Sequence, residues 1–212
     1  WGEKMGADRE TKEKLIASAK SEFMEKGYAK ASLRKICANA GVTTGALYFF
    51  FKDKEDLFRS IVEKPLRELI EIMQTHFTED VELLSVPNAY AYKDGDHEKL
   101  VQQLIHHLYA HRDAFLLLLT KAQGTAFENC VDDIVDMTEQ SYSAMAENMA
   151  KQTPGMQISS YMMHWLTHMN IDAFIHLLTH EPNEQRAMYY MHIIMNYLVK
   201  GWMEMILIPE EK

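Results

Sequence analysis

The sequence predicts an all-α fold of about nine helices, in which an N-terminal three-helix helix-turn-helix domain precedes a larger helical domain. Two observations carry this prediction. The 212 residues include only nine glycines and five prolines, too few for the many turns of an all-β fold. Apolar residues recur at the helical period along almost the whole chain, and the hydrophobic fraction of 47% is typical of a globular protein.

The first helix is expected over residues 8–26. Leu15, Ala19 and Phe23 form an apolar stripe along one side of it, and Gly27 is a suitable residue to end it. We expect residues 1–8 to be a flexible N-terminal segment, in which the native chain starts at the methionine at position 5.

The second and third helices follow from their capping residues. Ser32 is a good N-cap for a helix that ends at Gly41, where a glycine can adopt the positive φ of a turn. A third helix is expected over 43–51 because threonine hydroxyls precede the apolar Leu47.

A long fourth helix is expected from Asp53, whose side chain can cap it, to about residue 77. Pro65 lies inside this helix, and a proline removes one backbone hydrogen bond and usually kinks the helix. We therefore place the domain boundary there, with a first domain over 9–64 and a second over 65–212.

The second domain is also predicted to be helical. Residues 79–97 are expected to be a loop, because prolines, glycine, asparagine and aspartates gather there. No convincing strand is found. The remaining helices are expected over 96–110, 112–123, 125–151, 156–180 and 183–207.

Charge is divided unevenly along the chain. Residues 1–60 carry 12 Lys and Arg against 9 Asp and Glu, whereas residues 61–212 carry 10 against 22. The acidic part cannot lie along phosphates, and the basic part can. The two cysteines form no disulfide framework or zinc motif, no apolar run could span a membrane, and no signal peptide is recognisable, so we expect a cytoplasmic protein with no membrane partner.

Residues 32–51 have the spacing of a helix-turn-helix, in which the second helix enters the major groove of DNA. The stretch from Ala17 to Phe58 resembles the DNA-binding domain of TetR-family (TetR/AcrR-type) transcriptional repressors. The matching segments are Phe23–Tyr28, Ser32–Ile36, Ala40–Val42, Gly45–Tyr48 and Phe51–Phe58.

The resemblance implies a one-component regulator, most often a repressor, that binds a palindromic operator as a homodimer and is released by a small-molecule effector. It implies that residues at the start of the second helix, along the recognition helix and just after it contact DNA. These are Ser32, Leu33, Arg34, Thr43, Thr44, Gly45, Ala46, Tyr48, Phe49, Lys52 and Lys54. Lys54 would hold the flanking phosphate backbone. Phe49 and Phe50 stand where the family more often has a polar or histidine residue beside an aromatic one. A phenylalanine that faces the groove can make only apolar contacts with bases, for example with a thymine methyl group.

In this family the later helices form a ligand pocket and a dimer interface. We expect the homodimer to form through helices 156–180 and 183–207, which are apolar around more than one face. The effector is expected to be lipophilic, because many methionines favour an adaptable apolar cavity. The expected pocket residues are Met73, Phe77, Tyr109, Phe115, Leu118, Phe127, Ile134, Met137, Tyr161, Trp165 and Met169.

Three histidine pairs at i, i+4 spacing leave an alternative open. Each pair could face one metal ion, or form a polar seam or a pH-sensitive interface. The pairs are His107 with His111, His164 with His168, and His176 with His180. The alternative functions are a metal- or haem-responsive sensor regulator, a DNA-independent adaptor and a helical metalloenzyme. The main hypothesis is a regulator without enzymatic activity or cofactor, because no nucleophile or di-iron motif is found.

Overall fold

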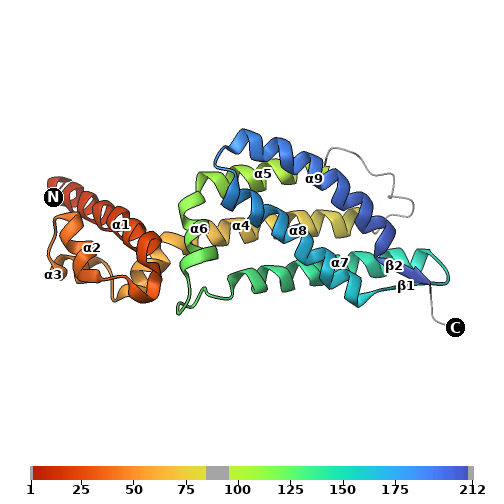
Figure 1. Cartoon of the computed structure of the whole chain (residues 1–212), viewed down its shortest axis with the longest axis horizontal. Helices are drawn as coiled ribbons and strands as arrows, with labels where there is room; N and C mark the ends of the chain where they lie inside the picture. The colour runs from red at the N-terminus through yellow and green to blue at the C-terminus, as the bar shows by residue number, and fades with distance from the viewer. Residues whose placement is uncertain (1, 85–95, 210–212) are drawn as a thin grey trace. The chain divides into compact units, whose positions relative to one another are not determined.

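The computed structural model describes residues 2–84 and 96–209. Within these residues the chain forms nine α-helices and one two-stranded sheet, which confirms the predicted all-α fold class (Figure 1). In chain order the elements are α1 (Gly2–Lys30), α2 (Leu33–Ala40), α3 (Thr44–Phe50), α4 (Lys54–Leu84), α5 (Asp96–Ala110), α6 (Arg112–Lys121), α7 (Cys130–Gln152), β1 (Met156–Ile158), α8 (Ser160–His180), α9 (Glu184–Met205) and β2 (Leu207–Pro209).

The chain divides into two compact units. Unit 1 comprises residues 1–68 and 111–130, and unit 2 comprises residues 69–110 and 131–212. The division falls inside α4, a few residues after Pro65. The segment 111–130, which the sequence assigned to the second domain, lies in unit 1 because α6 packs on α1. That packing joins segments far apart in the chain, and local sequence patterns carry no information about it.

The core of unit 1 contains the predicted stripe of α1. Leu15, Ala19 and Phe23 are fully buried, and the Phe23 ring packs edge-on against Phe58 of α4 with centroids 5.2 Å apart. Near its end, α1 is interrupted at Gly27, whose φ of 74° and ψ of 160° are not helical. The glycine that we expected to end the helix therefore interrupts it, and the chain returns to helical geometry as far as Lys30.

In unit 2, α9 packs against both α5 and α8. Two clusters of buried side chains hold these helices together. One consists of Val101, Ile105, Leu177, Ala187 and Met191, and the other of Met145, Ala146, Met149, Met163, Leu166 and Ile206. Four of these eleven side chains are methionines, which adapt their shape to irregular gaps.

Several predicted boundaries were wrong. Residues 2–8, expected to be flexible, belong to α1, and residues 79–84, expected to be loop, belong to α4. The rest of that expected loop, residues 85–95, lies outside the described residues. α7 begins at Cys130 rather than at residue 125, after a turn in which Gly124 has a φ of 84°.

The start of the helix predicted over 156–180 was also wrong, because residues 156–158 form a strand. β1 pairs antiparallel with β2, with Met156 opposite Pro209 and Ile158 opposite Leu207. α8 then begins at Ser160, and the Ser159 side chain accepts a hydrogen bond from the backbone of Met162. Such short strands form only when two distant segments meet, so periodicity within either one does not reveal them.

No helix in residues 2–84 or 96–209 combines the length and the apolar content that are needed to cross a bilayer.

Candidate nucleic-acid interface

Local capping interactions build the turn between α2 and α3. The Ser32 hydroxyl accepts a hydrogen bond from the backbone N–H of Lys35 at 3.4 Å and begins α2. Gly41 ends α2 with a left-handed φ of 69°, and its N–H donates to the carbonyl of Ala38. The Thr43 hydroxyl then accepts from the N–H of Ala46 at 3.2 Å and begins α3. These caps confirm the predicted helix-turn-helix geometry at the residues that we expected to provide it.

The outer face of α3 is apolar and exposed. Leu47 is fully buried and marks the inner side of the helix. Since successive residues of an α-helix turn by about 100°, Gly45 and Phe49 point away from Leu47 into solvent. Phe49 is 73% exposed and Tyr48 beside it is 55% exposed. The outer face of α3 is therefore free to meet another molecule.

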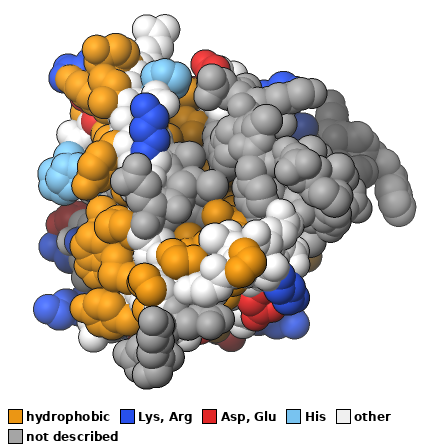
Figure 2. Space-filling view, turned by 90° about the vertical axis from the view of Figure 1, so that its right-hand side faces the viewer, with side chains coloured by type: hydrophobic (Ala, Val, Ile, Leu, Met, Phe, Trp, Pro, Cys, Tyr) orange, Lys and Arg blue, Asp and Glu red, His pale blue; other side chains and the backbone are white. Residues whose placement is uncertain are grey.

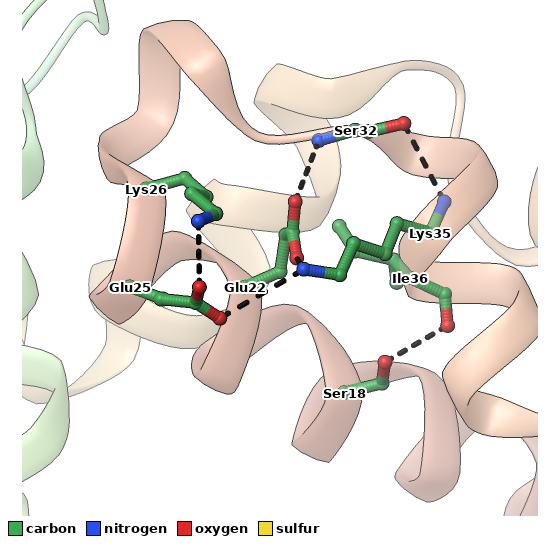
Figure 3. Close-up of polar contacts among 7 residues, drawn as sticks. All are labelled: Ser18, Glu22, Glu25, Lys26, Ser32, Lys35 and Ile36. Carbon is green, nitrogen blue, oxygen red and sulfur yellow. Dashed lines mark hydrogen bonds and ion pairs between the residues drawn. The ribbon is translucent and has the colours of Figure 1, made fainter.

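A buried carboxylate joins α1 to the start of α2 (Figure 3). Glu22 is only 3% exposed, and its Oε1 accepts a hydrogen bond from the backbone N–H of Ser32 at 3.3 Å. Its Oε2 lies 3.2 Å from Nζ of Lys35, and the Ser18 hydroxyl donates to the carbonyl of Ile36 at 2.8 Å. These contacts fix the orientation of α2, and of α3 behind it, relative to α1.

Lys54 lies where we did not expect it. Its Nζ donates hydrogen bonds to the carbonyl oxygens of Tyr28 at 2.8 Å, Ala29 at 3.2 Å and Ala31 at 3.4 Å. It also lies 4.5 Å from the centre of the Tyr28 ring. An ammonium group has three N–H donors, so the end of α1 can occupy all of them. The structure thus gives Lys54 a role in joining α4 to α1, while its predicted hold on the DNA backbone stays a prediction.

The loop after α6 packs on the same region of unit 1. Glu55 accepts a hydrogen bond from the Tyr28 hydroxyl and another from the backbone N–H of Ala126, the latter at 3.1 Å. The Phe127 ring lies 6.3 Å from that of Phe58. Burial, followed by the interaction with the Glu55 carboxylate, raises the pKa of Tyr28 to about 12. Tyr28 therefore stays neutral and donates its hydroxyl proton at physiological pH.

The other predicted DNA contacts lie on α2, α3 and the segments beside them. Leu33 and Ala46 are partly buried, whereas eight are exposed: Ser32, Arg34, Thr43, Thr44, Gly45, Tyr48, Phe49 and Lys52. The side chains of Arg34 and Lys52 form no ion pair with any described residue. Two uncompensated cations, one on α2 and one just after α3, therefore remain available.

The predicted pocket residues are divided between the two units, and the pocket itself stays a prediction. Phe115, Leu118 and Phe127 belong to unit 1, while the other eight belong to unit 2. Tyr161 and Trp165 are exposed on α8. Tyr109 donates its hydroxyl to the carbonyls of Leu177 and Glu181, at 3.1 and 2.6 Å. Met73 and Phe77 are buried on α4, and Ile134, Met137 and Met169 are partly buried.

The histidine pairs have separate surroundings. Nδ1 of His164 lies 2.8 Å from a carboxylate oxygen of Glu139, and its ring meets that of His168 edge-on. His176 and His180 stack with centroids 4.2 Å apart. In unit 1, Nε2 of His111 is 3.9 Å from Glu68, and His107 is partly buried on α5 of unit 2.

Unit 2 carries an open polar cavity and an exposed aromatic surface. The cavity, of about 660 Å³, is lined by Asp136, Glu139, Gln140, Ser143, Ala144, Glu147 and His164. None of the predicted pocket residues lines it. Large hydrophobic side chains are also exposed on α8 and α9, and we call this set the α8–α9 patch: Tyr161, Trp165, Tyr189, Tyr190, Ile193 and Tyr197. Figure 2, which views the molecule from one end, shows hydrophobic side chains gathered along the left-hand side of the picture.

Sequence reasoning missed three residues that shape the interface: Glu22, Tyr28 and Glu55. A signal existed for Glu22, because it lies seven residues after Leu15 and therefore on the buried side of α1. Tyr28 and Glu55 lie within the segments that resemble the TetR family, but their contacts were not predicted because their partners are far away in the sequence.

This interface region matches a known family. Residues 15–61 match the family model described as "Bacterial regulatory proteins, tetR family". The HTH-type transcriptional repressor BepR of Brucella suis biovar 1 is 42% identical over 64 residues, which cover 30% of this chain and 31% of BepR. The fatty acid metabolism regulator protein of Bacillus subtilis is 30% identical over 96 residues, which cover 42% of this chain and 50% of that protein. The chain thus matches from a third to half of the length of these curated relatives.

Solved structures resemble the chain over a longer range. A transcriptional regulator (TerR/AcrR family) from Aquifex aeolicus VF5 superimposes with a TM-score of 0.58 at 20% identity, covering 89% of this chain and 99% of that one. NalD, the secondary repressor of the MexAB-OprM multidrug efflux pump in Pseudomonas aeruginosa, superimposes with a TM-score of 0.52 at 18% identity. The superposition covers 92% of this chain and 97% of NalD. At these identities the likeness shows that the fold is shared.

Proposed function

We propose that this chain belongs to the TetR family of bacterial regulatory proteins, whose model residues 15–61 match, and that it is a transcriptional regulator that binds operator DNA as a homodimer. The observation that carries the proposal is the exposed outer face of α3, held in a helix-turn-helix, with the uncompensated cations Arg34 and Lys52 beside it. An α-helix of this kind fits the major groove, and free cations beside it can neutralise phosphates.

The DNA contacts divide into two kinds. Arg34, Lys52 and the Tyr48 hydroxyl bind phosphates and set the position of the domain on the duplex. Thr44, Gly45 and Phe49 face the base edges. Lys54 contributes indirectly, because it fixes α4 to the end of α1 and thereby supports the helix-turn-helix.

Dimerisation occurs through the α8–α9 patch. Large exposed apolar surfaces are uncommon on monomeric proteins and mark association sites. On α9, Tyr189, Ile193 and Tyr197 lie four residues apart and form one stripe, as do Tyr161 and Trp165 on α8. A two-fold dimer would place two recognition helices on half-sites about 34–36 Å apart. Together the two helices would contact enough base pairs for selective binding.

The regulator is a repressor that a lipophilic effector releases from DNA. The names of two similar proteins support the repressor role: NalD, a structural neighbour, is titled a repressor of a multidrug efflux pump, and the probable acrEF/envCD operon repressor of Escherichia coli K12 is 39% identical over 74 residues. The effector binds in unit 2, whose buried methionines favour an adaptable apolar site. The regulator acts in the cytoplasm, where bacterial operator DNA lies.

A competition gel shift with the full chain tests the DNA-binding proposal. The probe is the DNA immediately upstream of its own gene, at about 0.15 M salt, where non-specific binding is weak. We expect a discrete complex that survives an excess of unrelated duplex. Random duplexes provide a second probe in case the operator lies elsewhere, and failure to enrich any sequence from them would refute the proposal.

Matched variants sharpen this test. Arg34→Met should lower the slope of log affinity against log salt by about 0.9 for each phosphate that the side chain no longer neutralises. Lys14→Met is the control, because Lys14 is exposed on α1 and already pairs with Glu10 at 2.7 Å. Equal slopes for both variants would argue against the phosphate role of Arg34.

A further inference from the structure

The recognition helix lacks the side chains that usually read base edges. α3 has the sequence Thr-Gly-Ala-Leu-Tyr-Phe-Phe, without any Arg, Lys, Asn, Gln, Asp or Glu. Arg and Lys make paired hydrogen bonds to guanine, Asn and Gln make paired hydrogen bonds to adenine, and Asp and Glu accept a hydrogen bond from cytosine in the major groove. On α3 only the hydroxyls of Thr44 and Tyr48 can hydrogen-bond to DNA through a side chain. Hydrogen bonding from α3 is therefore too sparse to specify a half-site.

What α3 does present outward is apolar surface. Gly45 and Phe49 point directly away from the buried Leu47, so they occupy the centre of the outer face. A Cβ at Gly45 would meet only the Thr43 hydroxyl, at 3.8 Å, so the space beside the Phe49 ring is open. Phe50 supports that ring from one side, edge-on with centroids 4.9 Å apart. The ring is held by a neighbour and still leaves most of its surface exposed.

The chemistry of the major groove offers one match for such a surface. The 5-methyl group of thymine is the apolar group that base pairs present there. The free cations Arg34 and Lys52 beside α3 favour a polyanion over an apolar protein partner. The surface thus combines a ring that suits a methyl group with cations that suit phosphates.

We propose that Phe49 is the specificity-determining residue of α3 and that it reads thymine by contact with its 5-methyl group. The inference rests on the proposed DNA-binding function and deepens it. Each half-site carries a thymine opposite Phe49, and α3 selects it through methyl contact rather than through a hydrogen-bonded base edge. Burial of one methyl group corresponds to about a fourfold gain in affinity, and two half-sites give about fifteenfold.

The test removes only the methyl group. A duplex enriched by the full chain from random sequence is resynthesised with deoxyuridine in place of thymine, one symmetric pair of positions at a time. We expect one or two positions at which wild-type affinity falls by about fifteenfold, with the other thymines unaffected. At those positions Phe49→Ala should bind thymine and uracil duplexes equally, while Phe49→Leu, which keeps an apolar contact, should retain part of the difference.

The outcomes separate this inference from the proposed function. Selective binding that is equal for thymine and uracil at every position would overturn the role of Phe49 and leave the DNA-binding function intact. A full methyl effect that persists in Phe49→Ala would also overturn it, since another residue would then read the methyl group. Failure to enrich any duplex would refute the proposed function itself. The uracil series uses the wild-type chain, so the test does not depend on the folding of a variant.

Discussion

Replacing Lys54 by methionine should destabilise unit 1, because the ammonium group holds the end of α1. The variant loses hydrogen bonds to three backbone carbonyls, of which the one to Tyr28, at 2.8 Å, is the shortest. A hydrogen bond to a charged group contributes about 1.5–3 kcal/mol, and a partly exposed cation–π contact adds about 0.5–1 kcal/mol. Lys54 is partly exposed to solvent, so we take the lower end of these ranges and expect the free energy of unfolding to fall by about 2 kcal/mol.

Amide hydrogen exchange of the full chain measures this destabilisation locally. Peptides within residues 15–61 that exchange through opening of the whole unit should exchange about 30-fold faster in Lys54→Met. A loss of about 2 kcal/mol raises the opening equilibrium constant by this factor, because each 1.36 kcal/mol changes that constant tenfold. Lys52→Met is the matched control. It removes the same charge two residues earlier from an exposed side chain without an ion pair among the described residues, and should change stability by less than about 0.5 kcal/mol.

In a DNA-binding assay we expect the opposite order: Lys52→Met should have the larger effect and Lys54→Met the smaller. Lys52→Met should lower the salt slope by about 0.9 for each phosphate that Lys52 neutralises, whereas Lys54→Met should leave the slope unchanged. If Lys54→Met left hydrogen exchange unaltered and lowered the salt slope, the reasoning from the carbonyl contacts would be refuted. Lys54 would then hold the DNA backbone, as the sequence resemblance implied.

Three further predictions concern the interface and the dimer. Lys35→Met leaves the buried Glu22 carboxylate without its counter-ion and should lower the free energy of unfolding, measured in urea, by about 1–3 kcal/mol. Adding Glu22→Gln to this variant should recover part of that stability. Purely additive effects of the two substitutions would contradict the coupling between Lys35 and Glu22. Because the pKa of Tyr28 is raised to about 12 by burial and by Glu55, the unfolded chain ionises this tyrosine first as pH rises. The free energy of unfolding should therefore fall above pH 10 by up to about 1.4 kcal/mol per pH unit, and Tyr28→Phe, compared by urea unfolding at pH 9 and 11, should remove that part of the fall. Tyr197→Glu places a charge in the α8–α9 patch and should halve the mass measured by light scattering; an unchanged dimer would exclude the patch as the interface.

Much of the interface could be predicted because its geometry is local. The Ser32 and Thr43 caps and the left-handed Gly41 each involve residues within four positions of one another. Side chains with these properties begin and end helices in almost any setting, so their spacing along the chain already defines a helix-turn-helix. The buried stripe of α1 followed from helical periodicity in the same way.

The predicted pocket could not be derived in this manner. The eleven residues were chosen for being large and apolar, and such residues occur in a core, on a dimer surface or in a cavity alike. The structure separates these classes: Leu118 is buried in unit 1, Tyr161 is exposed on α8, and Met73 is buried on α4. Burial depends on which helices meet, and a residue's own helix does not encode its neighbours.

By itself the sequence determined the fold class, the helix-turn-helix and the outward position of Phe49, because hydrophobic period and capping act over a few residues. Only the tertiary structure decided that Lys54 reaches back to the end of α1, that α6 belongs with unit 1 and that β1 pairs with β2. Each of these joins segments more than twenty residues apart, so the packing of both segments must offset the entropy lost when the intervening chain is closed into a loop. The physical division is therefore between backbone preferences, which each short segment carries alone, and side-chain partners, which the packing of distant segments selects.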